Sequence, residues 1–383
     1  MKHNKIIFLV ISGVMVLMAA YFGLAHFEMM DDGFHYEGFT ESLARGHLDF
    51  KSFYGFQGLS FFAVPVFWLT RSHNSIILAS VLFVIFSVPL AYAVGRDLYG
   101  SKRAGIYGII LFLLMPFPYV TLMRGFQEAA LLFFILLIIY GSINKKTWTP
   151  VAWAVGSIVK PFSLVLLPLF LKDFLSKVKI KWLLLGVLIG LVYLGANFWQ
   201  TGHFSNDAAI NSYSGNYNIS NQPPLYKSFG LNIKGFLRVG ANLFISSRKI
   251  MVSPFVVLLG FLALYKNKFL PFRKEIILAV ILNILLVGVL TFSFSKYLLP
   301  MVVLLSLSSI YYLIRSKWLM IVVFLDSIFV FVALSKYYLS SFWPANSWAF
   351  WLPYFCATAL FVLIETRWFQ NLYVLKDHNH HSN

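Results

Sequence analysis

The sequence contains little charge and almost no cysteine. Only 12% of its 383 residues are Asp, Glu, Lys or Arg, against roughly 25% in soluble domains, whereas 59% are hydrophobic. Such a composition cannot cover a water-facing surface, so we expect lipid to solvate most of the chain. The single cysteine, Cys356, excludes an internal disulfide and a cysteine-rich metal site, and its apolar surroundings indicate a packing residue.

Acidic residues are scarcer than basic ones. Fourteen Asp and Glu stand against 31 Lys and Arg, which gives a formal net charge of +17. In a soluble protein this excess would suggest nucleic acid. Here the basic residues gather in short segments between apolar runs, as they do at the cytoplasmic ends of membrane spans, so we expect membrane lipid and no nucleic acid as a partner.

The apolar runs predict an all-α polytopic membrane protein with about twelve membrane crossings. Besides the ten candidate spans, the sequence has an apolar stretch at 148–171 that is interrupted by Lys160 and Pro161. Because proline and a charge disfavour a continuous helix at membrane depth, we expect two short helical pieces there that form a hairpin. The candidate spans are 6–27, 74–95, 104–122, 126–143, 181–199, 250–266, 275–294, 297–314, 317–335 and 346–365.

The distribution of Lys and Arg predicts the orientation. With the N-terminus inside, most basic clusters fall on the cytoplasmic side, and a single span at 148–171 would invert the later ones. Both termini are then cytoplasmic, and 28–73 and 200–249 are outer loops, the first with an interfacial helix at 56–69. We expect one transmembrane domain over 1–377 in a prokaryotic plasma membrane. The polar tail 378–383, despite its histidines, is expected to be a frayed end.

Six of the 14 acidic residues lie within the short segment 28–49. Asp31 and Asp32 come directly after the first predicted span and are followed by His35 and Tyr36. Two interpretations are open at this point. The segment is an ordinary solvated loop, or it holds a general base or a metal-binding carboxylate at the lipid boundary.

Other charges lie at the ends of apolar runs. Glu128 and Arg124, at the mouth of a later span, could meet the Asp pair in one cavity or could form a snorkelling pair that ends the span. Lys160 and Lys296 lie deep in apolar sequence, where a cation needs a carboxylate or a ligand phosphate as partner. For Lys296 the alternative is a loop lysine that reaches water.

These residues, in this order, resemble the membrane glycosyltransferases of the GT-C fold, which include protein O-mannosyltransferases and aminoarabinose transferases. Asp31-Asp32 resembles the family's first-loop signature, and Lys160-Pro161 follows Glu128 in the family's order. The run from Lys296 and Tyr297 to Pro300 is similar to a late Arg-Tyr-x-x-Pro element. The chain differs in having Glu128 where many members have Asp, and in lacking a large C-terminal soluble domain.

The resemblance implies a glycosyltransferase that moves a sugar from a polyprenyl-phosphate donor, with inversion, to a cell-envelope glycan, lipid or protein on the extracytoplasmic face. It implies that Asp31 or Asp32, with Asp31 favoured, takes a proton from the acceptor and that Glu128 belongs to the same catalytic centre. It also implies a set of substrate-binding residues, whose cations stabilise the leaving phosphate: His35, Tyr36, Arg124, Lys160, Lys296 and Tyr297.

Cofactors and rival functions stay open. A divalent cation is possible at Asp31, Asp32 and His35, but no spacing demands one, so we predict no metal site. The main alternative is a transporter or flippase of a lipid-linked or small anionic solute, which would use the same cations without making a bond. Transporters often contain repeated halves, and no internal repeat is evident here. A non-catalytic scaffold of the same fold is a further alternative.

Overall fold

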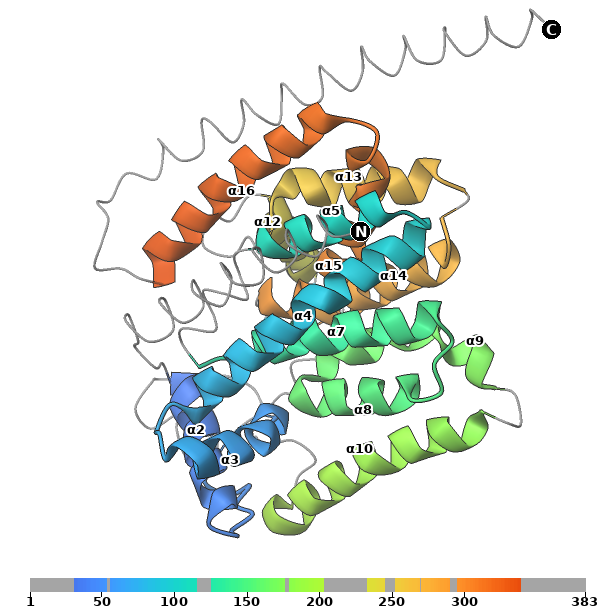
Figure 1. Ribbon diagram of the computed structural model, residues 1–383. Coiled ribbons are helices and arrows are strands. Elements are labelled where there is room, and N and C mark those ends of the chain that lie inside the picture. The colour runs from blue at the N-terminus through green and yellow to red at the C-terminus, as the bar shows by residue number, and fades with distance from the viewer. Residues whose placement is uncertain are drawn as a thin grey trace, which may run out of the picture.

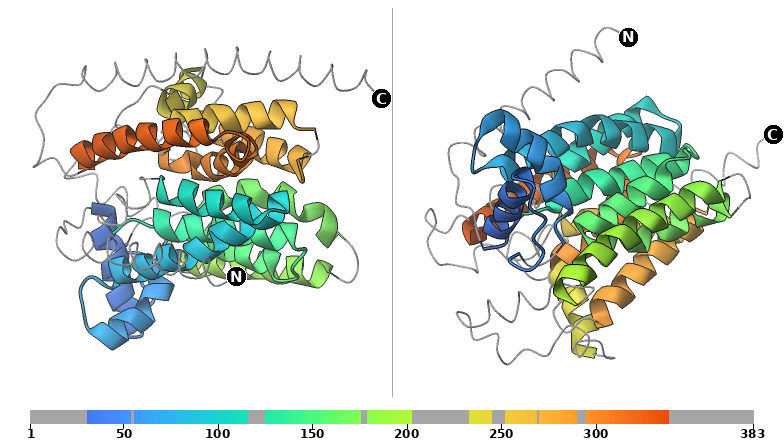
Figure 2. Two further views of the ribbon diagram at one scale, coloured as in Figure 1. Left: turned by 45° about the horizontal axis from the view of Figure 1, so that its top comes forward. Right: turned by 90° about the horizontal axis from the view of Figure 1, so that it is seen from below.

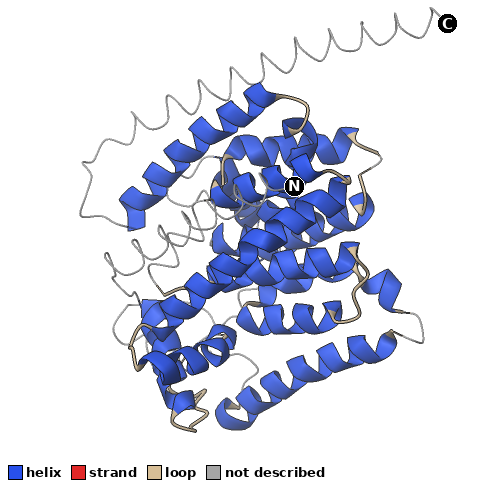
Figure 3. Cartoon of the chain, in the orientation of Figure 1, coloured by secondary structure: helices blue, strands red, loops and turns tan. Residues whose placement is uncertain are grey.

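The structure is a computed structural model that describes residues 31–53, 56–115, 125–175, 179–202, 233–244, 252–268, 270–289 and 295–338. Within these ranges every regular element is a helix (Figure 3). The α-helices and the 3₁₀ helices η1 and η4 follow one another as α2 (Asp31–Ala44), α3 (Gly58–Thr70), α4 (Ser75–Tyr99), α5 (Lys102–Leu113), α7 (Glu128–Ile143), α8 (Thr149–Val159), η1 (Pro161–Leu169), α9 (Leu171–Phe174), α10 (Ile180–Thr201), α12 (Ile233–Phe244), α13 (Pro254–Lys266), α14 (Arg273–Val289), η4 (Ser295–Leu298), α15 (Leu299–Leu313) and α16 (Lys317–Tyr338).

The helices pack in two groups (Figures 1 and 2). In the first, α4 contacts α3, α5 and α7, α7 contacts α8, and α8 contacts α10. In the second, α15 contacts α13, α14 and α16, while α12 packs on α14. The groups meet where α15 contacts α5 and α7 and where η1 contacts α14. The ends of α7, α8 and α15 can therefore contribute to one site.

Three of the described helical segments are long and apolar enough to cross a membrane: Ser75–Tyr99, Ile180–Thr201 and Lys296–Leu313. The first has the highest mean hydropathy of the three, 2.4. In the second, only 17% of the most apolar window is buried, and Leu184 and Leu191 are each 60% exposed. Because water would not solvate such a surface, lipid is the solvent that it requires.

The predicted spans within the described ranges coincide with helices. Residues 74–95 fall on α4, 126–143 on α7, 181–199 on α10, 250–266 on α13, 275–294 on α14, 297–314 on α15 and 317–335 on α16, and 104–122 begins with α5. The predicted spans 6–27 and 346–365, the tail 378–383 and most of the outer loop 200–249 lie outside the described residues. The number of crossings therefore stays a prediction.

The chain breaks at Lys160 and Pro161, as predicted. α8 ends at Val159, Lys160 is extended with φ −152° and ψ 133°, and η1 begins at Pro161. A proline ring disfavours the helical conformation of the residue before it, which explains the extended Lys160. The break leaves this lysine at the end of a helix, where its side chain can reach other elements.

The segment 28–73, predicted as an outer loop, is more helical than predicted in its described part. The expected helix at 56–69 is confirmed as α3, whose Leu59 and Ala63 are buried while Trp68 and Leu69 are exposed. Residues 31–44, predicted only as part of a loop, form helix α2, which packs on α3 at one end of the bundle (Figure 1). The two acidic residues at the start of α2 therefore belong to a helix.

Helix α10 fastens the segment that follows α2. The Gln57 backbone N–H donates a hydrogen bond to Tyr193 Oη at 2.8 Å, and Phe50 N–H donates one to Gln200 Oε1 at 2.8 Å. A Cβ on Gly58 would lie 2.4 Å from the Val159 backbone nitrogen, so the absence of a side chain lets α3 begin against the end of α8. These contacts hold the segment between α2 and α3 beside Lys160.

Candidate functional site

Two antiparallel helices bring the first ion pair together. Glu128 is the first residue of α7 and Lys160 follows the last residue of α8, so both lie at the same end of the packed pair. Lys160 Nζ donates a hydrogen bond to Glu128 Oε1, and the two side chains are 8% and 0% exposed. A carboxylate at a helix N-terminus and a cation at a helix C-terminus also suit the helix dipoles.

A second ion pair joins the start of α2 to the start of α15. Lys296 Nζ, in η4, lies 3.1 Å from Asp32 Oδ2, although the two residues are 264 positions apart. Their side chains are 20% and 23% exposed, so this pair is more accessible than the pair of Glu128 with Lys160. The Lys296 ammonium also lies 5.4 Å from the centroid of the Phe126 ring, which adds a cation–π contact.

The two pairs form one charged centre, defined as Asp32, Glu128, Lys160 and Lys296. Lys160 interacts electrostatically with Lys296 and Asp32 as well as with Glu128, and Lys296 interacts with Glu128. Two carboxylates thus balance two ammonium groups in a mostly buried place. An entering phosphate would compete with the carboxylates for charge-assisted hydrogen bonds from the lysines.

Asn283 holds the turn that carries Lys296. Its side-chain Nδ2 donates to the Tyr297 carbonyl at 3.0 Å, and its Oδ1 accepts from the Met301 backbone N–H at 3.1 Å. Asn283 lies in α14 and is fully buried, so it supplies a partner for an N–H that α15 itself cannot satisfy. Sequence reasoning missed this residue, although an amide inside the apolar run 275–294 was a signal.

The other predicted substrate-binding residues lie in different surroundings. The Tyr297 ring stacks on Phe162 with a centroid distance of 4.1 Å. His35 is half-buried and makes an edge contact with Phe53. Tyr36 is only 5% exposed and packs in the core. Arg124 and the side chain of Asp31 lie outside the described residues, although the backbone of Asp31 begins α2.

Three further acidic residues of the segment 28–49 have structural partners. Glu37 accepts hydrogen bonds from Ser75 Oγ at 2.5 Å and from the Ile76 N–H at 2.8 Å, so its carboxylate caps the start of α4. Burial raises the pKa of this carboxyl. Glu41 Oε1 lies 2.5 Å from His73 Nδ1 and raises the pKa of that imidazole. Asp49 accepts from two backbone N–H groups of its own turn. The concentration of acid is therefore partly structural.

The sequence predicted no metal site, although it left Asp31, Asp32 and His35 as possible ligands. In the part of the chain that the structure describes, no three His, Cys, Asp or Glu side chains group closely enough to hold a metal ion. The candidate ligands Asp31, Asp32 and His35 include one side chain outside the described residues. Asp32 itself bonds Lys296.

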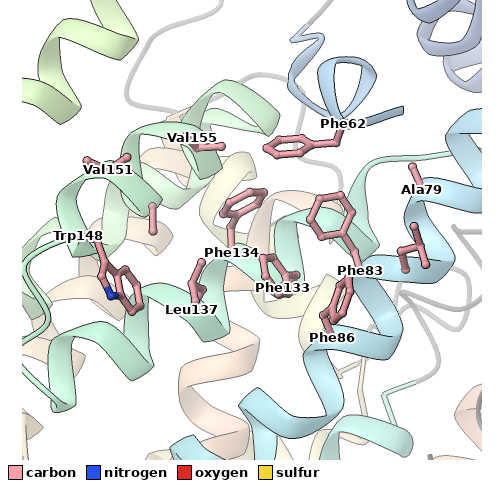
Figure 4. A pocket seen from close by; sticks show the side chains of 12 residues that line it. Phe62, Ala79, Phe83, Phe86, Phe133, Phe134, Leu137, Trp148, Val151 and Val155 are labelled. Carbon is pink, nitrogen blue, oxygen red and sulfur yellow. The ribbon is translucent and has the colours of Figure 1, made fainter. Parts of the chain in front are cut away.

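An apolar groove lies between helices α3, α4, α7 and α8 (Figure 4). It has a volume of about 550 Å³ and is lined by side chains of α3, α4, α7 and α8, among them Phe62, Phe83, Phe134 and Trp148. Leu137, which also lines it, is nine positions after Glu128, or two and a half helical turns, and so lies on the opposite face of α7. The groove is separate from the charged centre.

Solved structures share this arrangement. The chain matches ArnT from Cupriavidus metallidurans in the apo state with a TM-score of 0.58, and the same protein bound to undecaprenyl phosphate with a TM-score of 0.57. Each match has 14% identity and covers 90% of this chain and 66% of that chain. The chain has the GT-C fold. The fold class predicted from the sequence is thus confirmed.

The comparisons give the fold and no more. This chain spans just under two thirds of the length of ArnT, at an identity that carries no residue roles. No family model and no curated protein sequence matches the chain. Within the GT-C fold, the geometry of its own residues must supply the argument for function.

Proposed function

We propose that the protein is a glycosyltransferase that moves a sugar from a polyprenyl-phosphate donor to an acceptor on the extracytoplasmic side of the membrane. The observation that carries the proposal is the convergence of Lys160 and Lys296 with two carboxylates at one end of a GT-C bundle. A solved structure with this fold is bound to undecaprenyl phosphate, a lipid of the proposed donor class.

The two lysines suit the leaving group. As the bond between the sugar C1 and the phosphate oxygen breaks, its electron pair stays with the phosphate, whose negative charge grows. Lys296, the more exposed cation, and Lys160 would stabilise this charge. Because each lysine already bonds a carboxylate, donor binding rearranges the two pairs without creating an unpaired cation.

The acidic pair at the start of α2 suits the acceptor. A carboxylate takes the proton of the acceptor hydroxyl while the acceptor oxygen attacks the sugar C1 from the face opposite the phosphate. This attack inverts the configuration at C1. Because Asp32 bonds Lys296, we assign Asp32 the role of positioning this cation and Asp31 the role of accepting the proton. The acceptor is a glycan, lipid or protein of the cell envelope. No described observation favours a transporter over this reaction.

The test is sugar transfer or release from a panel of undecaprenyl-phosphate sugars by the purified protein in lipid. We expect turnover by the wild type and a loss of about 10²-fold or more in Asp31→Asn, with donor binding retained. Asp49→Asn is the matched control, because Asp49 lies in the same outer segment and accepts hydrogen bonds from Lys51 and Ser52 of its own turn. Substrate flux into liposomes without any bond cleavage would refute the proposal in favour of a transporter.

A further inference from the structure

Two oxygen atoms beside the charged centre lack a hydrogen-bond donor among the described residues. They are Gln127 Oε1 and Glu128 Oε2, and both residues are fully buried. Buried polar atoms in proteins are nearly always paired, so each unpaired one needs an explanation. Here two such atoms belong to neighbouring residues at the start of α7, which makes a shared cause the simplest explanation.

Existing bonds fix which atoms remain open. Gln127 Nε2 donates to the Phe56 carbonyl at 2.6 Å, and since a carbonyl can only accept, this bond identifies the amide oxygen as the open end. Glu128 Oε1 accepts from Lys160, which leaves Oε2. The residue before Gln127 is Phe126, whose ring lies against the Lys296 ammonium. The residues that carry the two open oxygens thus lie beside the contacts of both cations: Glu128 bonds Lys160, and Gln127 follows the residue that contacts Lys296.

The chemistry of the open atoms selects a ligand group. Both can only accept hydrogen bonds, and an ionised phosphate ester has none to donate, whereas a sugar presents several hydroxyl groups. The two lysines are therefore suited to bind the phosphate, and the two open oxygens to bind hydroxyl groups of the sugar attached to that phosphate. The neutral amide of Gln127 also adds no negative charge beside the phosphate.

We propose that Gln127, together with the open oxygen of Glu128, binds hydroxyl groups of the transferred sugar and so helps to select the donor. This inference rests on the proposed function, because it presumes a sugar linked to the phosphate that the lysines bind. It assigns Gln127 a role that neither the motif order nor the ion pairs indicate. Gln127 is a specificity-determining residue of this site.

The experiment compares a bare lipid phosphate with its sugar conjugates, in the wild type and in one variant. Binding of undecaprenyl phosphate and of its glucose, mannose, galactose and N-acetylglucosamine conjugates is measured for the wild type and for Gln127→Met. We expect the wild type to prefer at least one conjugate over the bare lipid by about tenfold, the effect of one well-placed hydrogen bond. Gln127→Met should lose this preference and bind the bare lipid within about twofold of the wild type.

Gln200→Met is the matched control. Gln200 also bonds backbone groups through its amide, but it lies on α10 and holds Leu48 and Phe50, so the preference should persist in this variant. An equal loss for bare and sugar-bearing lipid in Gln127→Met, or an undiminished preference, would overturn the inference. A wild type that binds none of these lipids would instead defeat the proposed function.

Deoxy-sugar conjugates provide a test that needs no folded variant. With the wild type, removing the hydroxyl that Gln127 or Glu128 binds should weaken binding by about tenfold, while removing other hydroxyls should change it little. If affinity is the same for every single-deoxy conjugate, the open oxygens do not bind the sugar, and the inference is wrong.

Discussion

The carboxylates in the two halves of helix α2 have different roles: one belongs to the candidate site, and the others hold the scaffold together. Asp32, in the first turn, is partly exposed and bonds a lysine of η4. Glu37 is buried and accepts hydrogen bonds from the start of α4, and Glu41 pairs with His73 on the surface. Five positions separate Asp32 from Glu37, about 1.4 turns, so the two side chains leave the helix in different directions. Partners and burial, and not the number of acids, distinguish the candidate site from the scaffold.

Variants of Lys160, Glu37, Asp32 and His73 test this division between site and scaffold, with an expected effect on stability that decreases in that order. For each variant, the free energy of unfolding is measured in lipid or detergent beside sugar transfer per folded molecule. A scaffold residue should change only the first quantity. A site residue should change the second even where the first is nearly unaltered.

Lys160→Met should have the largest effect. It leaves the fully buried Glu128 without its cation, and breaking a buried ion pair costs about 3–5 kcal/mol. The double variant with Glu128→Gln should recover most of this loss in stability and none of the transfer activity. Equal stabilities of Lys160→Met and the wild type would show that the buried pair does not form.

Glu37→Ala should lower stability by about 1–3 kcal/mol, because it removes the cap from α4 and leaves buried donors unpaired. Transfer per folded molecule should equal that of the wild type. Glu37→Gln, which keeps an accepting oxygen, is the control and should lose less stability. A folded Glu37→Ala that has lost transfer activity would move Glu37 from the scaffold to the site.

Asp32→Asn should lower stability by less than about 1 kcal/mol, because the pair with Lys296 is partly exposed to solvent. Transfer should nevertheless fall strongly, since Lys296 loses the carboxylate that positions it. The affinity for undecaprenyl phosphate separates two causes of this fall. A displaced Lys296 should weaken binding of the lipid, whereas loss of the catalytic base should leave binding unaltered. Unchanged turnover in Asp32→Asn would exclude Asp32 from the site.

His73 should show the smallest effect, and one that depends on pH. Glu41 raises the pKa of His73 above its ordinary value of 6.5, so the pair stabilises the fold fully below that value and less as the pH rises through the raised pKa. The wild type should therefore unfold at a higher temperature than His73→Gln at pH 5.5, and the difference should vanish at alkaline pH. A difference that grows with pH would contradict the assignment.

Local chemistry explains what the sequence could predict. The break at Lys160 was predictable because proline constrains the residue before it, and the need of Lys160 for an anion followed from the cost of burying a charge. Glu128 meets that need. The pairing of Asp32 with Lys296 was not predictable, because residues 264 positions apart meet only through the packing of the two groups of helices.

Helix α2 shows why the rest could not be predicted. Its sequence contains Gly33 and Gly38, which disfavour a helix, and no regular apolar stripe. Contacts with other elements hold it, among them its packing on α3 and the hydrogen bonds of Glu37 with the start of α4. Asn283 escaped notice for the same reason, since its role depends on two backbone groups beyond the end of its own helix. Tertiary contacts of this kind leave no periodic signal.

The proposed function requires that the charged centre binds a lipid-linked phosphate. The most direct test is the affinity of the wild type and of Lys296→Met for undecaprenyl phosphate and for undecaprenol, which lacks the phosphate. We expect the wild type to prefer the phosphate by about tenfold or more, and Lys296→Met to lose most of this preference while its affinity for undecaprenol stays unchanged. Equal affinity of the wild type for the two lipids would contradict the proposed function.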